Sequence, residues 1–336
     1  MAQDKILLGH GGGGRLTREL LDAVLLPPLR NQILDQLDDS AVIEIEDTRL
    51  AFTTDSYVID PLEFPGGDVG RLAVCGTVND LAMQGAVPAF LSLALIVEEG
   101  LPVAKLQHYI QSAAAAAKEA GVQFATGDTK VVERGHGSGL YINTAGIGKI
   151  LPGVNVSATN AQPGDKIIVT GNLGDHGIAV MSCREGLDFE SQVISDAAPL
   201  NKMVQNCLAG TPNVHVLRDP TRGGLTAAIC DIASKSNVGA RINEQTVPVQ
   251  AQVKAACELL GLDVLNVANE GKAVIICPAA DLSAVLTRLQ AHELGRDAVV
   301  VGEITNDHPG TVVLETAIGG ERILTPSSGE DLPRIC

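Results

Sequence analysis

A chain of 336 residues, 45% of them hydrophobic, is long enough to form two domains that each bury a core. Its formal net charge of −16 argues against nucleic acid and anionic membranes as partners, because phosphate contacts need clustered Lys and Arg. No stretch approaches the roughly 20 apolar residues of a membrane span, and the first residues do not form a signal peptide.

The N-terminal half predicts strands and helices that follow a glycine-rich start. Residues 1–35 predict a short strand, a loop over 9–14 and a helix over 16–26 that stops at Pro27 and Pro28. The next segments predict a hairpin over 41–46 and 49–54, a helix over 69–84, a strand over 89–97, a helix over 102–120 ended by Gly121, and strands over 122–126 and 140–150.

The C-terminal half begins after turn signals at Pro152-Gly153 and at 162–165, which favour a domain junction. Its patterns predict strands over 166–170, 273–277, 299–304 and 311–314, and helices over 177–184, 225–234, 253–260 and 282–291. Strand pairs joined by short turns, together with helical connections, predict an α+β fold with mixed sheets. The segment from Pro326 onward lacks periodicity and predicts a mobile, flexible tail.

The cysteines indicate a reducing compartment, so we expect a cytoplasmic protein. None of the 7 cysteines forms a CxxC pair, and most of them lie within apolar or helical patterns. Neither a zinc site nor a disulfide framework is therefore expected. Cys336 differs from the others because it is the last residue of the chain.

The glycine-rich loop over 9–14 satisfies the GxGxxG pattern but not its context. The acidic residue expected about 20 positions further, at the end of a second strand, is missing. Arg15-Leu16 stands where a Walker A loop needs Lys followed by Ser or Thr. These absences argue against a nicotinamide oxidoreductase, while a backbone phosphate cradle and a plain flexible loop both stay open.

Several aspartates lie at the ends of predicted elements or beside glycine, with apolar neighbours. Magnesium bound with a nucleotide takes a few carboxylates plus phosphate oxygens, so convergence of these side chains would suit such a site. The alternative is that they cap helices and form turns, which Asp favours generally. The residues are Asp39, Asp55, Asp80, Asp128 and Asp219.

Two further ionisable residues have settings that suit chemistry. Lys130 follows a turn that contains glycine, where an ammonium group could meet phosphate charge. Glu270 precedes an apolar strand, where partial desolvation would raise its pKa toward that of a useful base. Both types are more often solvated surface residues, and His10 is similarly ambiguous.

Together these segments resemble the HypE family of hydrogenase maturation proteins, within the superfamily of aminoimidazole ribonucleotide synthetase and selenophosphate synthetase. The Pro333-Arg334-Ile335-Cys336 ending is the specific part, since small-molecule kinases of the superfamily lack it. Gly12 departs from the Ser that relatives often carry, which puts in doubt only a side-chain role there. The other matching stretches are 10–14, 54–61, 78–80, 127–132, 174–177, 219–224 and 269–272.

The resemblance implies a two-domain aminoimidazole ribonucleotide synthetase-like fold, with ATP in the cleft between domains. It implies residues 1–35 as a loop and helix, 36–152 as an ATP-binding domain that pairs across a homodimer into a β-barrel, 153–325 as an α+β domain, and 326–336 as the mobile tail. It also implies magnesium ligands at Asp39, Asp55, Asp80 and Asp219, and nucleotide contacts at Asn79, Gly127, Asp128, Thr129, Lys130, Thr221, Arg222 and Gly223.

The activity implied is that of an ATP-dependent carbamoyl dehydratase. A HypF-type carbamoyltransferase would load the Cys336 thiol, and dehydration to a thiocyanate would supply the cyanide ligand of hydrogenase iron to a HypC–HypD-type acceptor complex. Glu270 is the first candidate for the base, with Lys130 or His10 assisting. The alternatives are a small-molecule kinase or synthetase of the same superfamily and a non-catalytic docking protein. Selenophosphate synthetase is disfavoured because no Cys precedes Cys75.

Overall fold

The N-terminal segment consists of short helical elements joined by turns. The computed structural model describes residues 5–186, 192–210, 213–327, 332 and 334–336. The strand predicted near the start does not form, because the backbone N–H of Leu7 donates to His10 Nδ1 and that of His10 donates to the Leu7 carbonyl. The segment contains η1 (Leu8–Gly11), α1 (Arg15–Leu20), the π-helical turn η2 (Leu21–Leu25), α2 (Leu26–Leu29) and η3 (Leu34–Gln36).

The predicted helix stop at Pro27 and Pro28 is wrong, since the chain stays helical to Leu29. A wide turn precedes the prolines, in which the backbone N–H of Leu26 donates to the Leu21 carbonyl. The prolines then fall in the first turn of α2. Proline is tolerated there because the backbone N–H groups of a first helical turn make no hydrogen bond within the helix.

The first sheet has the order β1-β2-β7-β5-β6 among the described residues, with β5 and β6 parallel and the other neighbours antiparallel. The predicted hairpin of β1 and β2 is confirmed, and its two-residue turn holds Glu46 at φ 53°. The strands are β1 (Ala41–Ile45), β2 (Thr48–Tyr57), β5 (Ala86–Glu98), β6 (Gln123–Val132) and β7 (Leu140–Ile150), beside the short, unpredicted pair β3 (Glu63–Phe64) and β4 (Gly67–Asp68).

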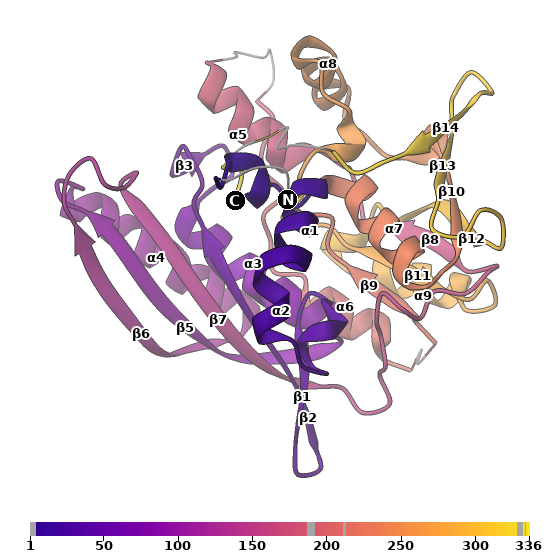
Figure 1. The fold of residues 1–336 in the computed structure, drawn as a ribbon, viewed down its shortest axis with the longest axis horizontal. Helices are drawn as coiled ribbons and strands as arrows, with labels where there is room; N and C mark the ends of the chain where they lie inside the picture. The colour runs from indigo at the N-terminus through magenta and orange to yellow at the C-terminus, as the bar shows by residue number, and fades with distance from the viewer. Residues whose placement is uncertain (1–4, 187–191, 211–212, 328–331, 333) are drawn as a thin grey trace.

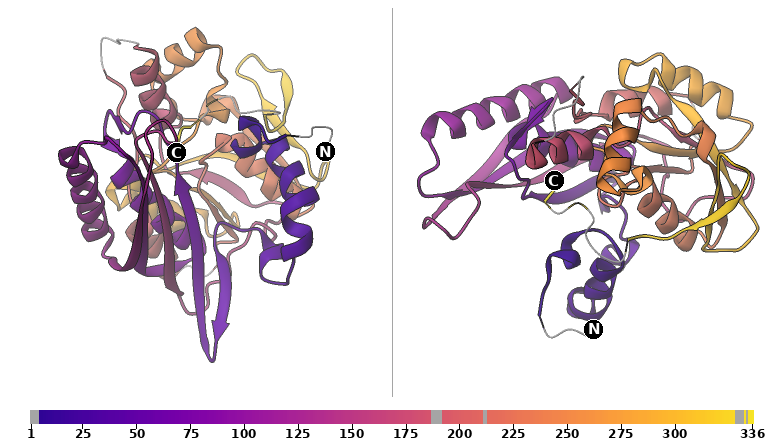
Figure 2. Two further views of the ribbon diagram at one scale, coloured as in Figure 1. Left: turned by 60° about the vertical axis from the view of Figure 1, so that its left-hand side comes forward. Right: turned by 90° about the horizontal axis from the view of Figure 1, so that it is seen from above.

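Helices α3 (Val69–Met83) and α4 (Val103–Ala120) cover one face of this sheet (Figures 1 and 2). The Asp68 carboxylate caps α3 by accepting from the backbone N–H groups of Gly70 and Arg71. Gly121 ends α4 at φ 80°, as predicted. The opposite face of the sheet leaves large apolar side chains exposed in the single chain, among them Phe52, Phe90 and Ile96.

Strand β6 is longer than predicted. The sequence prediction ended it at Thr126, but β6 pairs with β5 along its whole length, from Phe90↔Gln123 to Glu98↔Val132. Gly127 lies within this strand. Its position requires glycine, because a Cβ there would stand 2.3 Å from the Leu93 carbonyl oxygen. The residues expected on a turn after the strand therefore lie on the strand itself, at the edge of the sheet.

The second sheet has the order β14-β13-β10-β12-β8-β11-β9 in the described part of the chain. Only β10 and β13 pair in parallel, so both sheets are mixed and the predicted α+β class is confirmed. Its strands are β8 (Lys166–Val169), β9 (Val216–Arg218), β10 (Gly239–Asn243), β11 (Val274–Cys277), β12 (Val299–Thr305), β13 (Val312–Glu315) and β14 (Glu321–Leu324).

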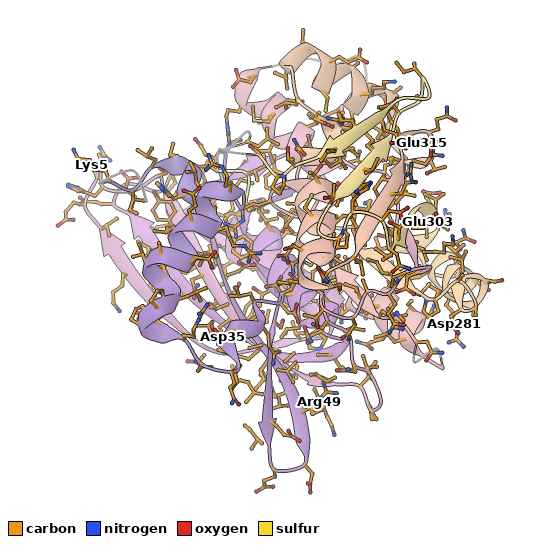
Figure 3. All side chains as sticks on the ribbon, turned by 45° about the vertical axis from the view of Figure 1, so that its right-hand side comes forward. Lys5, Asp35, Arg49, Asp281, Glu303 and Glu315 are labelled. Atoms are coloured by element: carbon orange, nitrogen blue, oxygen red, sulfur yellow. The ribbon has the colours of Figure 1, made fainter. Side chains whose placement is uncertain are left out.

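Helices lie around this second sheet (Figure 1), and the N-terminal helices project from one side of the molecule in front of the junction between the two halves (Figure 2). Figure 3 shows the labelled side chains of Arg49, Glu303 and Glu315 at the periphery of the molecule. No helix in the described residues is long and apolar enough to cross a membrane. The helices are α5 (Asp175–Glu185), α6 (Asn201–Leu208), α7 (Gly224–Lys235), α8 (Ala251–Leu260) and α9 (Leu282–Gln290), with short turns η4 (Glu244–Thr246), η5 (Val264–Asn266) and η6 (Glu293–Gly295).

Candidate active site

A cavity of ≈ 920 Å³ lies where several parts of the chain meet. The N-terminal segment contributes Gly13 to α1, the first sheet contributes the end of β2, and the second half contributes the connection from β9 to α7. The last residue of the chain, Cys336, also lines it. The cavity thus joins segments that are far apart in the sequence.

The four aspartates predicted as magnesium ligands all line this cavity. Thr53 donates its hydroxyl to Asp80 Oδ2 at 2.8 Å, and Tyr57 donates to Asp55 Oδ2 at 3.2 Å. These bonds hold two of the carboxylates against the wall formed by β2 and α3. The set comprises Asp39 before β1, Asp55 on β2, Asp80 on α3 and Asp219 directly after β9.

Burial raises the pKa of each of these carboxyl groups, and repulsion from other aspartates of the set adds to the shift of Asp80 and Asp219. The pKa of Asp39 rises to about 6 although Arg218 opposes the shift, and the pKa of Asp80 rises well above its ordinary value. Burial likewise raises the pKa of Asp55 and of Asp219, for which Asp39 is the next cause. Carboxylates crowded in this way ionise together only with a compensating cation, so their chemistry fits a divalent metal. Among the described residues, however, no three acidic, His or Cys side chains stand in a ligand cluster.

Glu270 stands at the same cavity with a buried carboxyl group. It is 3% exposed, and its Oε1 has no hydrogen-bond partner in the described residues. Desolvation, followed by the charges of Asp219 and Asp196, raises its pKa well above the ordinary value. A group of this kind is suited to take up a proton from a bound substrate.

Arg222 and Thr221 reach the cavity from the loop between β9 and α7. The Arg222 guanidinium donates to the Gly11 carbonyl at 3.1 Å, which ties this loop to the N-terminal segment. The negative charge of Cys336 is the largest cause that raises the pKa of Arg222, and Asp55 and Glu270 add to it. Arg222 is therefore the positive charge that faces the end of the tail.

Lys130 and its neighbours Gly127, Asp128 and Thr129 do not line the cavity within one chain. Lys130 Nζ lies 2.7 Å from both carboxylate oxygens of Asp128, and both side chains are largely exposed, at 67% and 62%. Since β6 extends to Val132, these residues lie on the edge strand of the first sheet. Within one chain, Lys130 and Glu270 therefore do not line the same cavity.

Three other predicted site residues also lie outside the lining. His10 is buried, and its Nδ1 accepts from the backbone N–H of Leu7. Gly223 caps α7 at φ 76°, where a left-handed conformation favours glycine.

Asn79 has a structural contact instead of a position in the cavity. Its amide nitrogen donates to the Ala198 and Glu270 carbonyls, both at 3.1 Å, and its oxygen accepts from Leu200. These bonds connect α3 to the backbone that carries Glu270.

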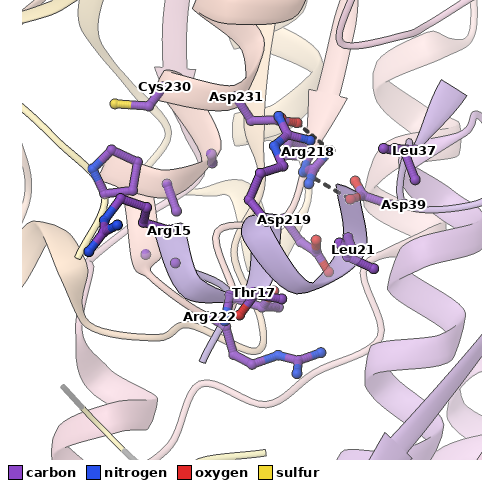
Figure 4. Close-up of a pocket in the computed structure, with 18 of the residues that line it drawn as sticks. Arg15, Thr17, Leu21, Leu37, Asp39, Arg218, Asp219, Arg222, Cys230 and Asp231 are labelled. Carbon is purple, nitrogen blue, oxygen red and sulfur yellow. Dashed lines mark hydrogen bonds and ion pairs between the residues drawn. The ribbon is translucent and has the colours of Figure 1, made fainter. Parts of the chain in front are cut away.

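Sequence reasoning missed a buried ion network beside the acidic cluster (Figure 4). Arg218 Nε lies 2.9 Å from Asp39 Oδ1, and Arg218 Nη1 lies 3.3 Å from Asp231 Oδ2. Arg18 on α1 and Lys235 on α7 pair with the same Asp231. The network links the N-terminal helix to Asp39, and no local motif signals it because its members come from three distant segments.

Comparison with known proteins identifies the family to which the chain belongs. The family models "AIR synthase related protein, N-terminal domain" and "C-terminal domain" match residues 37–150 and 162–315. The carbamoyl dehydratase HypE of Azotobacter vinelandii is 48% identical over 327 residues, which cover 97% of this chain and 96% of that protein. The chain belongs to the HypE family of carbamoyl dehydratases.

Solved structures of the HypE family share the whole architecture. A HypE from a crystal structure of a HypE–HypF complex has a TM-score of 0.87 and 44% identity, over 92% of this chain and 99% of that one. A HypE crystallised in complex with ATP has a TM-score of 0.84 and 44% identity, over 99% and 100%. The predicted aminoimidazole ribonucleotide synthetase-like fold is thereby confirmed.

Proposed function

We propose that this protein uses ATP to dehydrate a carbamoyl group carried on the Cys336 thiol to a thiocyanate, which supplies the cyanide ligand of nickel–iron hydrogenase. The observation that carries the proposal is the position of Cys336 in one cavity with Glu270 and the aspartate cluster. Family membership and an ATP-bound relative of 44% identity support it.

The reaction balances without an external oxidant or reductant. The amide oxygen of Cys336–S–C(O)NH₂ attacks the γ-phosphorus of ATP and displaces ADP, which turns a poor leaving group into phosphate. The C–O bond then breaks, the nitrogen loses both protons, and Cys336–S–C≡N, ADP, phosphate and one proton result. The oxygen that is lost leaves in the phosphate, so no free water is released.

Glu270 is the group placed to accept a proton from the carbamoyl nitrogen. Its raised pKa makes it a stronger base than an ordinary carboxylate, and Arg222 nearby opposes this shift. The buried Oε1 without a partner is the atom available for that proton. His10 does not line the cavity and is the weaker candidate.

The aspartate cluster and the phosphate-facing groups would hold the nucleotide. Asp39, Asp55, Asp80 and Asp219 are suited to hold Mg²⁺, which when bound offsets charge on the transferring phosphoryl group. The guanidinium of Arg222 and the hydroxyl of Thr221 lie on the same wall and would orient the phosphates.

We further propose that two copies of the chain complete each site. Strand β6 is an edge strand, and the uncovered sheet face beside it exposes Phe90 and Ile96. Pairing of two such sheets, as in the β-barrel implied by the resemblance, would bring the Gly127–Lys130 stretch of one copy to the cavity of the other. Lys130 would then neutralise phosphate charge in the neighbouring site.

The partners follow from the chemistry at the tail. A HypF-type carbamoyltransferase would load Cys336, since a relative forms a HypE–HypF complex. A HypC–HypD-type complex would then accept the cyanide. A cytoplasmic location agrees with the need for a reduced thiol.

The proposal is tested by intact mass spectrometry of the whole protein with a HypF-type enzyme, carbamoyl phosphate and ATP. We expect the gain of the mass of one carbamoyl group and then a decrease equal to the mass of one water, both mapped to the C-terminal peptide. Loading without this mass decrease in the presence of Mg²⁺ and ATP would contradict the dehydration step. ATP turnover that needs a free small molecule and ignores the tail would favour a kinase instead.

A further inference from the structure

The end of the tail lies antiparallel to residues 58–60, the segment that directly follows β2. The backbone N–H of Val58 donates to the Cys336 carbonyl at 3.1 Å, and that of Asp60 donates to the Arg334 carbonyl at 3.2 Å. In such a pair alternate residues bond to the neighbouring strand, and the residue between them turns its carbonyl away. The carbonyl of Ile335 accordingly points toward the second half of the molecule.

His176 meets this carbonyl from the first turn of α5. Its Nε2 lies 2.9 Å from the Ile335 oxygen, and its Nδ1 lies 2.8 Å from Ser195 Oγ. The ring is 0% exposed and packs edge-on against Phe64, with ring centroids 5.3 Å apart. A fully buried imidazole in this position contacts the tail one residue before the reactive thiol.

The hydrogen bonds define one tautomer of the ring. A carbonyl oxygen only accepts, so Nε2 carries the proton and Nδ1 accepts from the Ser195 hydroxyl. Ser195 Oγ in turn accepts from the backbone N–H of Ala197 at 3.1 Å. Burial lowers the pKa of His176, which agrees with a neutral ring.

The rest of α5 holds the same segment of tail. Arg184, in the last turn, donates to the Arg334 carbonyl at 2.9 Å and to the Asp60 carbonyl. The side chains of Leu332 and Ile335 are 8% and 3% exposed and pack into the core that includes α5. The described end of the tail is therefore docked by apolar side chains, and the backbone bonds set its register.

We propose that His176 is a positioning residue for the tail: through Ile335 it fixes the depth at which Cys336 enters the cavity. The effect of His176 on catalysis rests on the proposed function, whereas the contact between His176 and the docked tail does not depend on that function. His176 touches no reacting atom. Loss of its donor would leave a buried carbonyl without a partner, which disfavours the docked tail by about tenfold.

The test compares His176→Phe, which keeps an aromatic ring against Phe64, with His176→Gln, which restores an N–H donor near the position of Nε2. The matched control is His108→Phe, since His108 lies on α4 and is 60% exposed. The measurement is the rate at which fluorescein maleimide labels Cys336 in the full chain, mapped by peptide mass, with the exposed Cys183 as internal reference.

We expect labelling of Cys336 to rise about tenfold in His176→Phe, to return near the native rate in His176→Gln, and to stay unchanged in His108→Phe. Single-turnover dehydration of the carbamoylated protein should fall in parallel while the ATP concentration for half-maximal rate stays constant. Equal Cys336 labelling in all variants would overturn the positioning role of His176. If the variants are labelled as expected but the native protein never dehydrates a carbamoyl group, the proposed function fails and the positioning role of His176 stands.

A second measurement applies even if His176→Phe does not fold. In the native chain, ¹⁵N–¹H spectra should show a protected Nε2–H signal for His176, and deletion of residues 334–336 should make it exchange with solvent. A signal that the deletion leaves unchanged would contradict the contact.

Discussion

At the scale of single residues, the site combines buried acids that repel one another with little compensating charge. The side chains of Thr53, Tyr57 and Arg218 bond to the carboxyl groups of Asp80, Asp55 and Asp39, respectively, yet the pKa of all four carboxyl groups stays raised. A raised acid pKa in the folded state costs stability once the pH exceeds the unfolded value of 3.8, and the cost grows up to the folded pKa. The raised pKa values therefore cost stability at neutral pH, and the Mg²⁺ proposed above would offset that cost.

Asp80→Asn should separate these two effects. The amide oxygen can still accept from Thr53, so we expect the variant to fold and to melt at a higher temperature than the native protein at pH 7 without metal. Between pH 4 and pH 7, the melting temperature of the variant should fall less than that of the native protein, because the variant has one carboxyl group fewer to ionise in the buried site. Added Mg²⁺ and ATP should stabilise it less than the native protein, and dehydration should be lost. Differential scanning fluorimetry measures the first three effects, and native-like Mg²⁺ stabilisation with normal turnover would contradict the metal assignment.

Glu270→Gln should load normally but stall before dehydration. Removal of a general base costs about 10²–10⁴-fold in rate, so the carbamoylated species should accumulate in the mass spectrum. Because the pKa of Glu270 is raised, the single-turnover rate of the native protein should increase with pH at values well above 4.5. This increase of the rate with pH should be absent from the variant. Unchanged nitrile formation would exclude Glu270 as the base.

At the scale of elements, the position of β6 decides which residues a single chain can bring together. The strand runs to Val132 at the sheet edge and places Lys130 away from Glu270. A site shared between two copies would reunite them, because each cavity would combine one chain's Glu270 with the other chain's Lys130.

Mixed dimers provide the test of this shared site. Chains with Lys130→Ala and chains with Glu270→Gln should each be inactive alone. Coexpression at equal amounts gives mixed dimers in half of the population, each with one complete cavity, so about a quarter of native activity should return. Tandem purification through two tags isolates the mixed dimers for the rate measurement. Failure of the mixture to regain activity would place Lys130 outside the shared site.

At the scale of the whole molecule, the tail connects the two halves by returning to the segment that follows β2. The backbone N–H groups of Val58 and Asp60 donate to the carbonyls of Cys336 and Arg334, respectively, while the Ile335 carbonyl contacts α5 of the second half. The chain end thereby reaches a cavity built from both halves.

One extra residue after Cys336 should disturb only the chemistry. Cys336 lines the cavity and its negative charge raises the pKa of Arg222, and an added glycine would move the terminal carboxylate one residue further along the chain. We expect native folding and ATP binding but slower dehydration, measured by single turnover on the loaded tail. Cys336→Ala should bind ATP and accept no carbamoyl group, and loading of that variant at another cysteine at native rate would refute the anchor role.

The sequence determined the fold class, the alternation of elements and the identity of the candidate groups. Periodicity is a local property, so the hairpin at 41–54, the helix ended by Gly121 and the apolar strands were predictable. Asp39, Asp55, Asp80 and Asp219 were recognisable because they stand at element ends or beside glycine. The domain boundaries after 35, 152 and 325 stay predictions.

The tertiary structure alone decided which of these residues meet. It placed Lys130 on an edge strand, gave Asn79 a structural role, and joined Arg218 to Asp39 and Asp231. It also showed His176 beneath the docked tail, although 159 residues separate it from Ile335. Contacts over such separations depend on sheet order and packing, which no local pattern encodes.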